Sequence, residues 1–147
     1  MFGREDARER GALAGLLTPE QRGLFDSMHP ADRRHGLEVV RRLRAEGWSE
    51  PELLVAGLLH DAGKGRTGLW PRVAWSLGQR YGRPARRAAE LLPGSAPALR
   101  RLDLHAELSA ELALAVGSTP RTADLIRRQA GPVDAAGEAL RRADEAS

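Results

Sequence analysis

The apolar residues of this chain recur at intervals of three or four, the spacing that places side chains on one face of an α-helix. Three sets show this spacing, and each is expected to form the buried face of its own helix: Val39, Val40 and Leu43; Trp70, Val73, Ala74, Leu77 and Tyr81; and Leu108, Leu112 and Val116. No stretch alternates apolar and polar residues as a half-buried strand does. The hydrophobic pattern therefore predicts an all-α fold.

One segment is apolar on every side. Residues 53–59 contain only leucine, valine, alanine and glycine, and a helix of this length is too short to span a membrane. Such a helix belongs at the centre of a bundle, where other helices cover all of its faces. The segment runs directly into His60 and Asp61, so two polar side chains end the most buried helix.

Capping residues and glycines mark the helix starts and ends. Thr18 and Thr119 each precede a proline, which is the usual order of a helix N-cap and first turn. Ser49 and Glu52 have the spacing of a capping box, in which each side chain bonds the other residue's backbone N–H. Glycine ends helices readily because it adopts the left-handed conformation at little cost. We expect helices to end at four glycines: Gly47, Gly63, Gly82 and Gly117.

The length of 147 residues suits one domain with a single core. We expect a polar, frayed N-terminal segment over residues 1–17, followed by a compact, single-domain helical bundle over residues 18–147. The first residues are charged rather than apolar, so we expect neither a secretory signal nor a membrane span. The chain has no cysteine, which excludes disulfides and thiolate metal sites and suits a cytoplasmic protein.

Basic residues are numerous but nearly balanced by acids. The chain has 23 arginines and lysines against 20 aspartates and glutamates, for a formal charge of +3. Lys64 is its only lysine, and many arginines stand in doublets among acidic residues. This pattern is typical of solvated helix faces, so we expect no nucleic-acid partner. A nucleic-acid binder would need these bases gathered on one surface.

Placing His60 and Asp61 at a buried helix end is costly, because an unpaired buried carboxylate loses its solvation. A divalent cation would satisfy both side chains. His35 lies on the apolar stripe of its helix and should face the core, and Asp144 lies one turn beyond the last leucine of the chain. His35, His60, Asp61 and Asp144 are therefore candidate metal ligands.

Asp124 is the alternative to Asp144 as the last ligand. It stands on the helix that follows Thr119, but Arg127 and Arg128 come three and four residues later. That spacing is typical of a surface ion pair. We therefore expect Asp144 to be the ligand.

The four candidate ligands offer two imidazole nitrogens and two carboxylates, with a combined charge of −2. This donor set suits one divalent ion of manganese, iron, cobalt, nickel, zinc or magnesium. Four ligands leave coordination positions open for a water and a phosphate oxygen. Such a site could support hydrolysis of a phosphate ester.

Residues 58–64, with His35 upstream and Asp144 downstream, resemble the H…HD…D signature of the HD-domain metal-dependent phosphohydrolases. The resemblance covers residues 33–145 and includes the alanine, glycine and lysine after the HD pair. It implies a helical bundle of the HD-domain type, in which the four candidate ligands hold a divalent metal. It also implies an enzyme that cleaves phosphate esters, often those of nucleotides.

The resemblance also implies roles for residues around the metal. Asp61 would be both ligand and proton acceptor, and Lys64 would contact the substrate phosphate or hold Asp61. Arg66 would help to neutralise that phosphate. His105 resembles the third histidine of members that bind two metals, and we expect it to line the substrate pocket.

Gln129 stands where those two-metal members carry a further histidine. One metal and phosphomonoester hydrolysis are therefore expected, rather than two metals and phosphodiester hydrolysis. The alternative is a regulatory module that keeps the metal or a nucleotide without catalysis. The expected substrate is a small phosphorylated molecule such as a nucleotide, and no motif identifies it further.

The other conspicuous residues have structural interpretations. His29 precedes a proline and is expected in a solvated turn. The three tryptophans, Trp48, Trp70 and Trp75, are expected to pack in or at the edge of the core.

Overall fold

The computed structural model describes residues 11 and 13 and the ranges 15–64 and 98–147, with the backbone alone over 98–104. Within these ranges the chain is helical and contains no strand, which confirms the predicted all-α class. The elements are α2 (Pro19–Ser27), α3 (Pro30–Ala45), α4 (Pro51–Leu59), η1 (Ala62–Lys64), a 3-10 turn, α7 (Ala98–Ala115), α8 (Pro120–Arg127) and α9 (Ala135–Ala146). The helix predicted over 70–81, with Trp70 and Trp75, and the helix end at Gly82 lie outside the described residues.

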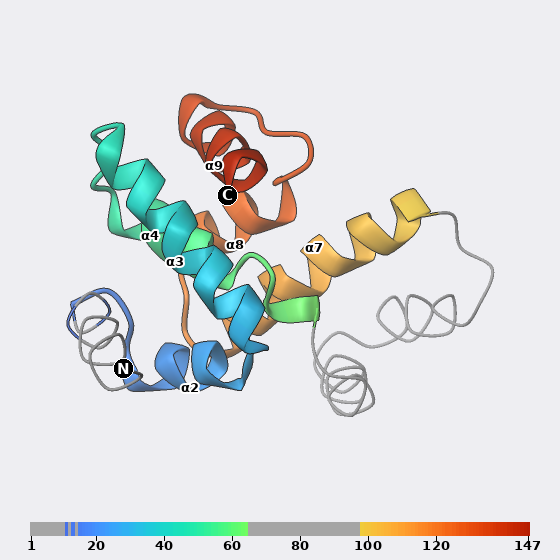
Figure 1. Ribbon diagram of the computed structural model, residues 1–147. Coiled ribbons are helices and arrows are strands. Elements are labelled where there is room, and N and C mark those ends of the chain that lie inside the picture. The colour runs from blue at the N-terminus through green and yellow to red at the C-terminus, as the bar shows by residue number, and fades with distance from the viewer. Residues whose placement is uncertain (1–10, 12, 14, 65–97) are drawn as a thin grey trace.

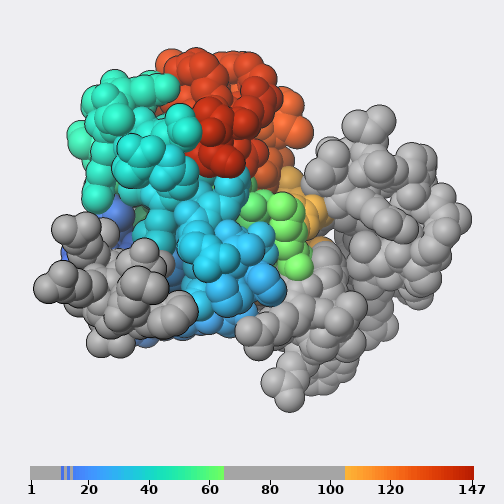
Figure 2. Space-filling model, viewed as in Figure 1, coloured from blue at the N-terminus to red at the C-terminus, as the bar shows by residue number. Residues whose placement is uncertain are grey.

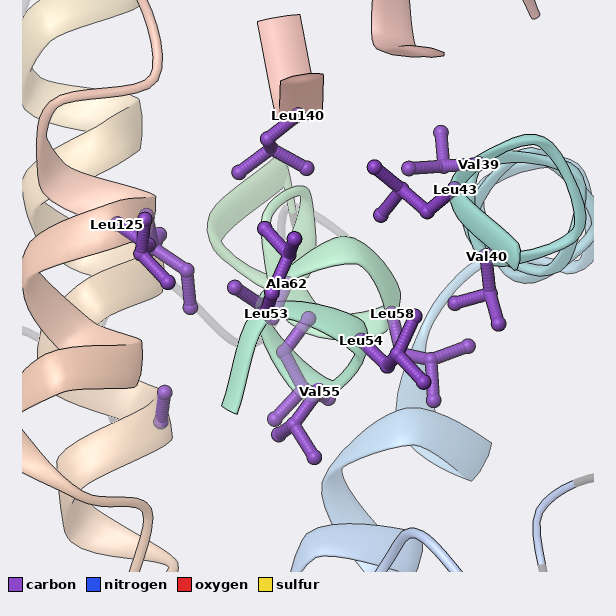
Figure 3. Close-up of a cluster of buried hydrophobic side chains, with 14 of the residues drawn as sticks. Val39, Val40, Leu43, Leu53, Leu54, Val55, Leu58, Ala62, Leu125 and Leu140 are labelled. Carbon is purple, nitrogen blue, oxygen red and sulfur yellow. The ribbon is translucent and has the colours of Figure 1, made fainter. Parts of the chain in front are cut away.

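Helix α4 occupies the centre of the fold, as its all-apolar sequence predicts. Every residue from 53 to 59 is buried, and α4 packs against α2, α3, α8 and α9. Figure 1 shows α3 and α4 running side by side. In Figure 3 the side chains of α4 point in several directions, toward apolar residues of α3, α8 and α9: Val39, Val40, Leu43, Leu125 and Leu140.

The core extends further toward the N-terminus than the boundary expected at residue 18. Leu13 is buried, and Leu16 and Leu17 pack against the same core as α4. Trp48 also packs there, as expected. The packed domain therefore includes at least part of the segment expected to fray.

Two glycines let α3 and α4 approach each other closely. A Cβ on Gly36 would lie 3.1 Å from the carbonyl oxygen of Leu58, and one on Gly57 would lie 3.2 Å from Cγ1 of Val39. Without these Cβ atoms, the two backbones come nearly into contact. The close approach brings His35, the neighbour of Gly36, beside the C-terminal end of α4.

The buried face of α7 differs from the predicted stripe of Leu108, Leu112 and Val116. Leu108 is buried, but Leu112 and Val116 are only half-buried. The face against the core consists mainly of small residues: Ala106, Ser109, Ala110 and Ala113. Because these side chains are short, α7 packs closely on η1 and α8. The pattern of large apolar residues alone therefore misplaced the face by part of a turn.

Helices begin at all three predicted starts, and two of the three predicted caps are confirmed. Thr18 and Gln21 form a capping box, in which each side chain accepts from the other residue's backbone N–H. Thr119 accepts a hydrogen bond from the backbone N–H of Thr122. The capping box at Ser49 and Glu52 is wrong, because α4 has Glu50 as its N-cap and no side-chain cap bond. The Glu52 carboxylate instead accepts from the Thr119 hydroxyl, which joins the first turns of α4 and α8.

Glycine ends α3 and α7 as predicted, but it does not end α4. Gly47 and Gly117 have φ angles of +94° and +88°, in the left-handed region that glycine adopts without strain. Gly63 has no positive φ and lies within η1. Its role is close packing against α7, because a Cβ there would lie 2.8 Å from Oγ of Ser109 and 2.9 Å from the carbonyl oxygen of His105.

Many of the arginines in the described ranges are paired with acids on the same or a neighbouring helix. Arg22, Arg128 and Arg141 pair with acids one turn away, and Arg127 joins α8 to two glutamates of α7. This pairing agrees with the expectation that the arginines serve solvated helix faces. Among the helices that the structure describes, none combines the length and apolar character needed to cross a membrane.

We expect Asp134→Asn to weaken the fold in a pH-dependent way. Asp134 caps α9 through Gly137 and lies 2.6 Å from Nη1 of Arg121, and the bond with Arg121 holds the pKa of Asp134 below its ordinary value. A lowered folded-state pKa contributes stability above the unfolded pKa of about 3.9, and this contribution is lost as the pH falls through the folded value. Asparagine keeps a capping oxygen but cannot ionise.

Urea denaturation from pH 7 down to pH 3 measures this effect. The wild type should be the more stable protein at pH 7, and the difference should shrink below about pH 4. Asp134→Ala, which removes both the ion pair and the cap, should be about 1 kcal/mol less stable than Asp134→Asn throughout the series. A difference between wild type and Asp134→Asn that stays constant with pH would show that the ion pair contributes nothing.

Candidate metal centre

Four side chains from three parts of the chain meet beside the C-terminal end of α4. His35 comes from α3, His60 and Asp61 follow α4, and Asp144 comes from α9. Oδ1 of Asp144 lies 2.6 Å from Nε2 of His35 and 3.1 Å from Nε2 of His60. Oδ2 of Asp61 lies 3.4 Å from Nε2 of His60 and 3.9 Å from Nε2 of His35. The predicted meeting of these four residues is confirmed.

A hydrogen bond to the backbone of its own helix fixes the orientation of the His60 ring. Its Nδ1 lies 2.7 Å from the carbonyl oxygen of Gly57, to which it donates a hydrogen bond. The proton at Nδ1 leaves Nε2 free to face the cluster as a metal ligand, which is the usual arrangement of metal-binding histidines. The ring centroids of His35 and His60 are 5.4 Å apart, so both imidazoles border the same small space.

Two titratable side chains of the cluster, His60 and Asp61, are buried. Burial opposes the charging of His60, but the hydrogen bond to Asp144 and the charges of Asp61 and Asp144 outweigh it and raise the pKa of His60. Burial likewise opposes ionisation of Asp61, but His105, His60 and Lys64 hold the pKa of Asp61 well below its usual range. The two carboxylates therefore attract positive charge into this space.

The donor atoms are close enough together to share one ion. One donor atom each from His35, His60 and Asp144 lie within 4.8 Å of one another. Ligands at 2.0–2.2 Å from a transition metal are separated from each other by roughly 3 Å, so small side-chain adjustments suffice. Asp61 borders the same space through Oδ2. His35, His60 and Asp144 could therefore hold a metal ion, and Asp61 lies beside them.

Lys64 and His105 lie next to this cluster on the side of Asp61. Nζ of Lys64 is 3.5 Å from Oδ2 of Asp61, and its side chain is half-exposed. Nε2 of His105 is 3.6 Å from Oδ1 of Asp61, is buried, and has no hydrogen-bond partner among the described residues. Oδ2 of Asp61 thus faces the other candidate ligands, and Oδ1 faces His105.

One edge of the site is open. The side chains of His35 and Asp144 are 26% and 38% exposed, whereas that of His60 is 1% exposed. The atoms of η1, green in Figure 2, appear at the surface next to those of α3. The cluster is therefore buried at His60 and more accessible at His35 and Asp144, and the half-exposed Lys64 lies beside Asp61.

Other residues named from the sequence lie away from the cluster or outside the described ranges. Asp124 pairs with Arg128 on the surface of α8, as the spacing predicts. His29 caps α3 by accepting from the backbone N–H of Ala31 and is exposed. Arg66 lies outside the described residues.

Gln129 and Ser109 contact the backbone around the cluster instead of the candidate ligands. Nε2 of Gln129 donates to the carbonyl oxygen of His60 at 3.2 Å. Oγ of Ser109 accepts from the backbone N–H of Gly63 at 2.8 Å. The sequence marks Ser109 only by its spacing, one turn after His105, which places both residues on one helix face.

Comparisons of this chain with protein families, with curated proteins and with solved structures yield no match. The functional interpretation therefore depends on the cluster, its accessible edge and the sequence signature that brings its residues together.

Proposed function

We propose that this protein is a metal-dependent phosphohydrolase of the HD-domain type, which binds one divalent ion and hydrolyses a small phosphorylated substrate. The observation that carries the proposal is the convergence of His35, His60, Asp61 and Asp144 on one partly open space. These are the residues that match the H…HD…D signature. Such a metal, when bound, lowers the pKa of a water ligand and polarises the phosphorus centre.

The residues of the chain would divide the remaining work. His60, buried and held by Gly57, provides the rigid side of the site. Asp61 stays ionised, so its carboxylate would accept a hydrogen bond from the attacking water and orient it. Its low pKa makes it a weak acceptor of a full proton. Lys64, at the accessible edge, would neutralise the incoming phosphate.

Metal analysis and an activity panel test the proposal together. The purified protein should contain about one transition ion per chain and should hydrolyse an aryl phosphate or a member of a panel of nucleotides. Prolonged dialysis against a chelator should remove both the ion and the activity, and adding back manganese, cobalt or zinc should restore them. A protein that takes up no ion from any of these salts contradicts the proposal.

Lys64→Met should reduce catalysis while leaving the metal in place. A charged hydrogen bond to phosphate contributes roughly 1.5–3 kcal/mol, so we expect kcat/KM to fall about 10- to 100-fold. Because Nζ of Lys64 is 3.5 Å from Asp61 and half-exposed, its loss leaves the candidate ligands in position. Lys64→Arg is the matched control, and it should retain more activity than the methionine variant. Loss of the metal in Lys64→Met would assign the lysine to holding Asp61 instead.

A regulatory module without catalysis is the second candidate. It is favoured by Gln129, whose amide binds backbone carbonyls at the position where two-metal members of the family carry a histidine. This candidate predicts a stoichiometric metal and no turnover of any substrate in the panel. The pairing of the arginines with acids disfavours nucleic-acid binding. If the protein did bind nucleic acid through them, its affinity for nucleic acid would fall steeply with salt and would survive removal of the metal.

A further inference from the structure

The turn that carries His60, Asp61 and Lys64 is held by side chains from helix α7 and from the turn after α8. From the turn after α8, Gln129 donates to the carbonyl oxygen of His60. From α7, the fully buried Ser109 accepts from the backbone N–H of Gly63. Neither side chain has a donor or acceptor contact with the candidate ligand atoms. Together they bond the backbone at both ends of the segment 60–63.

This segment depends on such bonds because it is where α4 stops. The last carbonyls of a helix have no partner within the helix, and the carbonyl of His60 is one of these. The N–H of Gly63 is buried in η1, where an unpaired donor is costly. Without Gln129 and Ser109, the segment would have to rotate to satisfy these groups, and such a rotation would move the side chains of His60 and Asp61.

We propose that Gln129 and Ser109 are positioning residues that set the geometry of the metal site. The proposal rests on the proposed metal binding and extends it to two residues that contact no ligand atom. Groups that orient metal ligands commonly change affinity 10- to 100-fold when they are removed. We therefore expect Gln129→Met and Ser109→Ala each to weaken binding of cobalt by about tenfold or more.

Thr122 provides a matched control on α8, the helix that directly precedes the turn of Gln129. Its hydroxyl donates to the carbonyl oxygen of Glu52 at 3.0 Å, so it also joins α8 to the backbone of α4. Glu52 lies in the first turn of α4, at the opposite end from His60. Thr122→Val keeps the shape of the side chain and removes the bond. A merely structural role for Gln129 predicts that Gln129→Met and Thr122→Val have the same consequences.

The experiment compares cobalt binding and the visible absorption of bound cobalt in the wild type and the three variants, with urea denaturation of the metal-free proteins. We expect all three variants to lose stability, but only Gln129→Met and Ser109→Ala to lose cobalt affinity and change the absorption bands, which report coordination geometry. Wild-type affinity and spectra in both of these variants overturn the positioning role alone. Equal affinity losses in Thr122→Val also overturn it. A wild type that binds no cobalt overturns the metal site and the positioning role together.

Discussion

His60→Ala should abolish the proposed metal binding and, with it, the proposed phosphatase activity. His60 is the most buried of the candidate ligands, and its Nε2 lies within 3.4 Å of a carboxylate oxygen of both Asp61 and Asp144. Removing a residue that orients a ligand lowers affinity up to about 100-fold, so removing the ligand itself should cost more. Isothermal titration with cobalt and elemental analysis after dialysis measure the loss directly.

Folding must be controlled in this experiment, because His60 also pairs with the buried carboxylate of Asp61 and the half-buried carboxylate of Asp144 in the metal-free protein. Breaking a buried charge pair costs roughly 3–5 kcal/mol, so His60→Ala should unfold at lower urea concentration than the wild type. His35→Ala provides a second test, since His35 is 26% exposed and its removal should disturb the core less. Circular dichroism should show a folded protein without metal in that variant.

His29→Ala is the negative control for both variants. His29 is exposed at the start of α3, and its side chain accepts a bond from the nearby N–H of Ala31, the one hydrogen bond of that side chain within the described ranges. This variant should bind one ion with wild-type affinity. If His60→Ala kept the wild-type metal content, or if His29→Ala lost as much metal as His60→Ala, the cluster would not be the metal-binding site.

Gly63→Ala should cause the second large effect, a loss of about 2–3 kcal/mol in the free energy of unfolding of the metal-free protein. The added Cβ would lie 2.8 Å from Oγ of Ser109 and 2.9 Å from both the backbone N of Ser109 and the carbonyl oxygen of His105. Two of these three atoms belong to the backbone of α7, so a change of rotamer cannot relieve the overlap. Either α7 or η1 must shift, and the bond between Ser109 and Gly63 must lengthen.

Gly23→Ala is the matched control for this substitution. Gly23 lies on the exposed side of α2, and a Cβ there would meet no atom within 4 Å. The same change should be neutral or should stabilise the protein by up to about 1 kcal/mol, because alanine favours the helix. Urea denaturation of the two variants compares them directly. A Gly63→Ala protein as stable as the wild type would contradict the close packing of η1 on α7.

The helices and much of the site could be predicted from the sequence. The all-apolar run before His60 identified the central helix, and the stripe on α3 placed His35 toward the core. The spacing of Asp124 and Arg128 identified a surface pair and left Asp144 as the partner of the histidines. These predictions succeeded because helical periodicity, ion-pair spacing and caps such as Thr18 depend on residues within a few positions of each other.

Tertiary packing decided what the local pattern could not. Glu52 bonds Thr119 of another helix instead of capping its own, and Gly63 serves the approach of α7 instead of a left-handed turn. Likewise, nothing in the residues around Ser109 and Gln129 specifies that they bond the backbone beside the candidate metal centre. The local sequence around a residue determines whether it lies on a helix and on which face of that helix its side chain lies. Its hydrogen-bond partner depends on which backbone groups another helix brings within about 3 Å, and that distance exists only after the helices have packed.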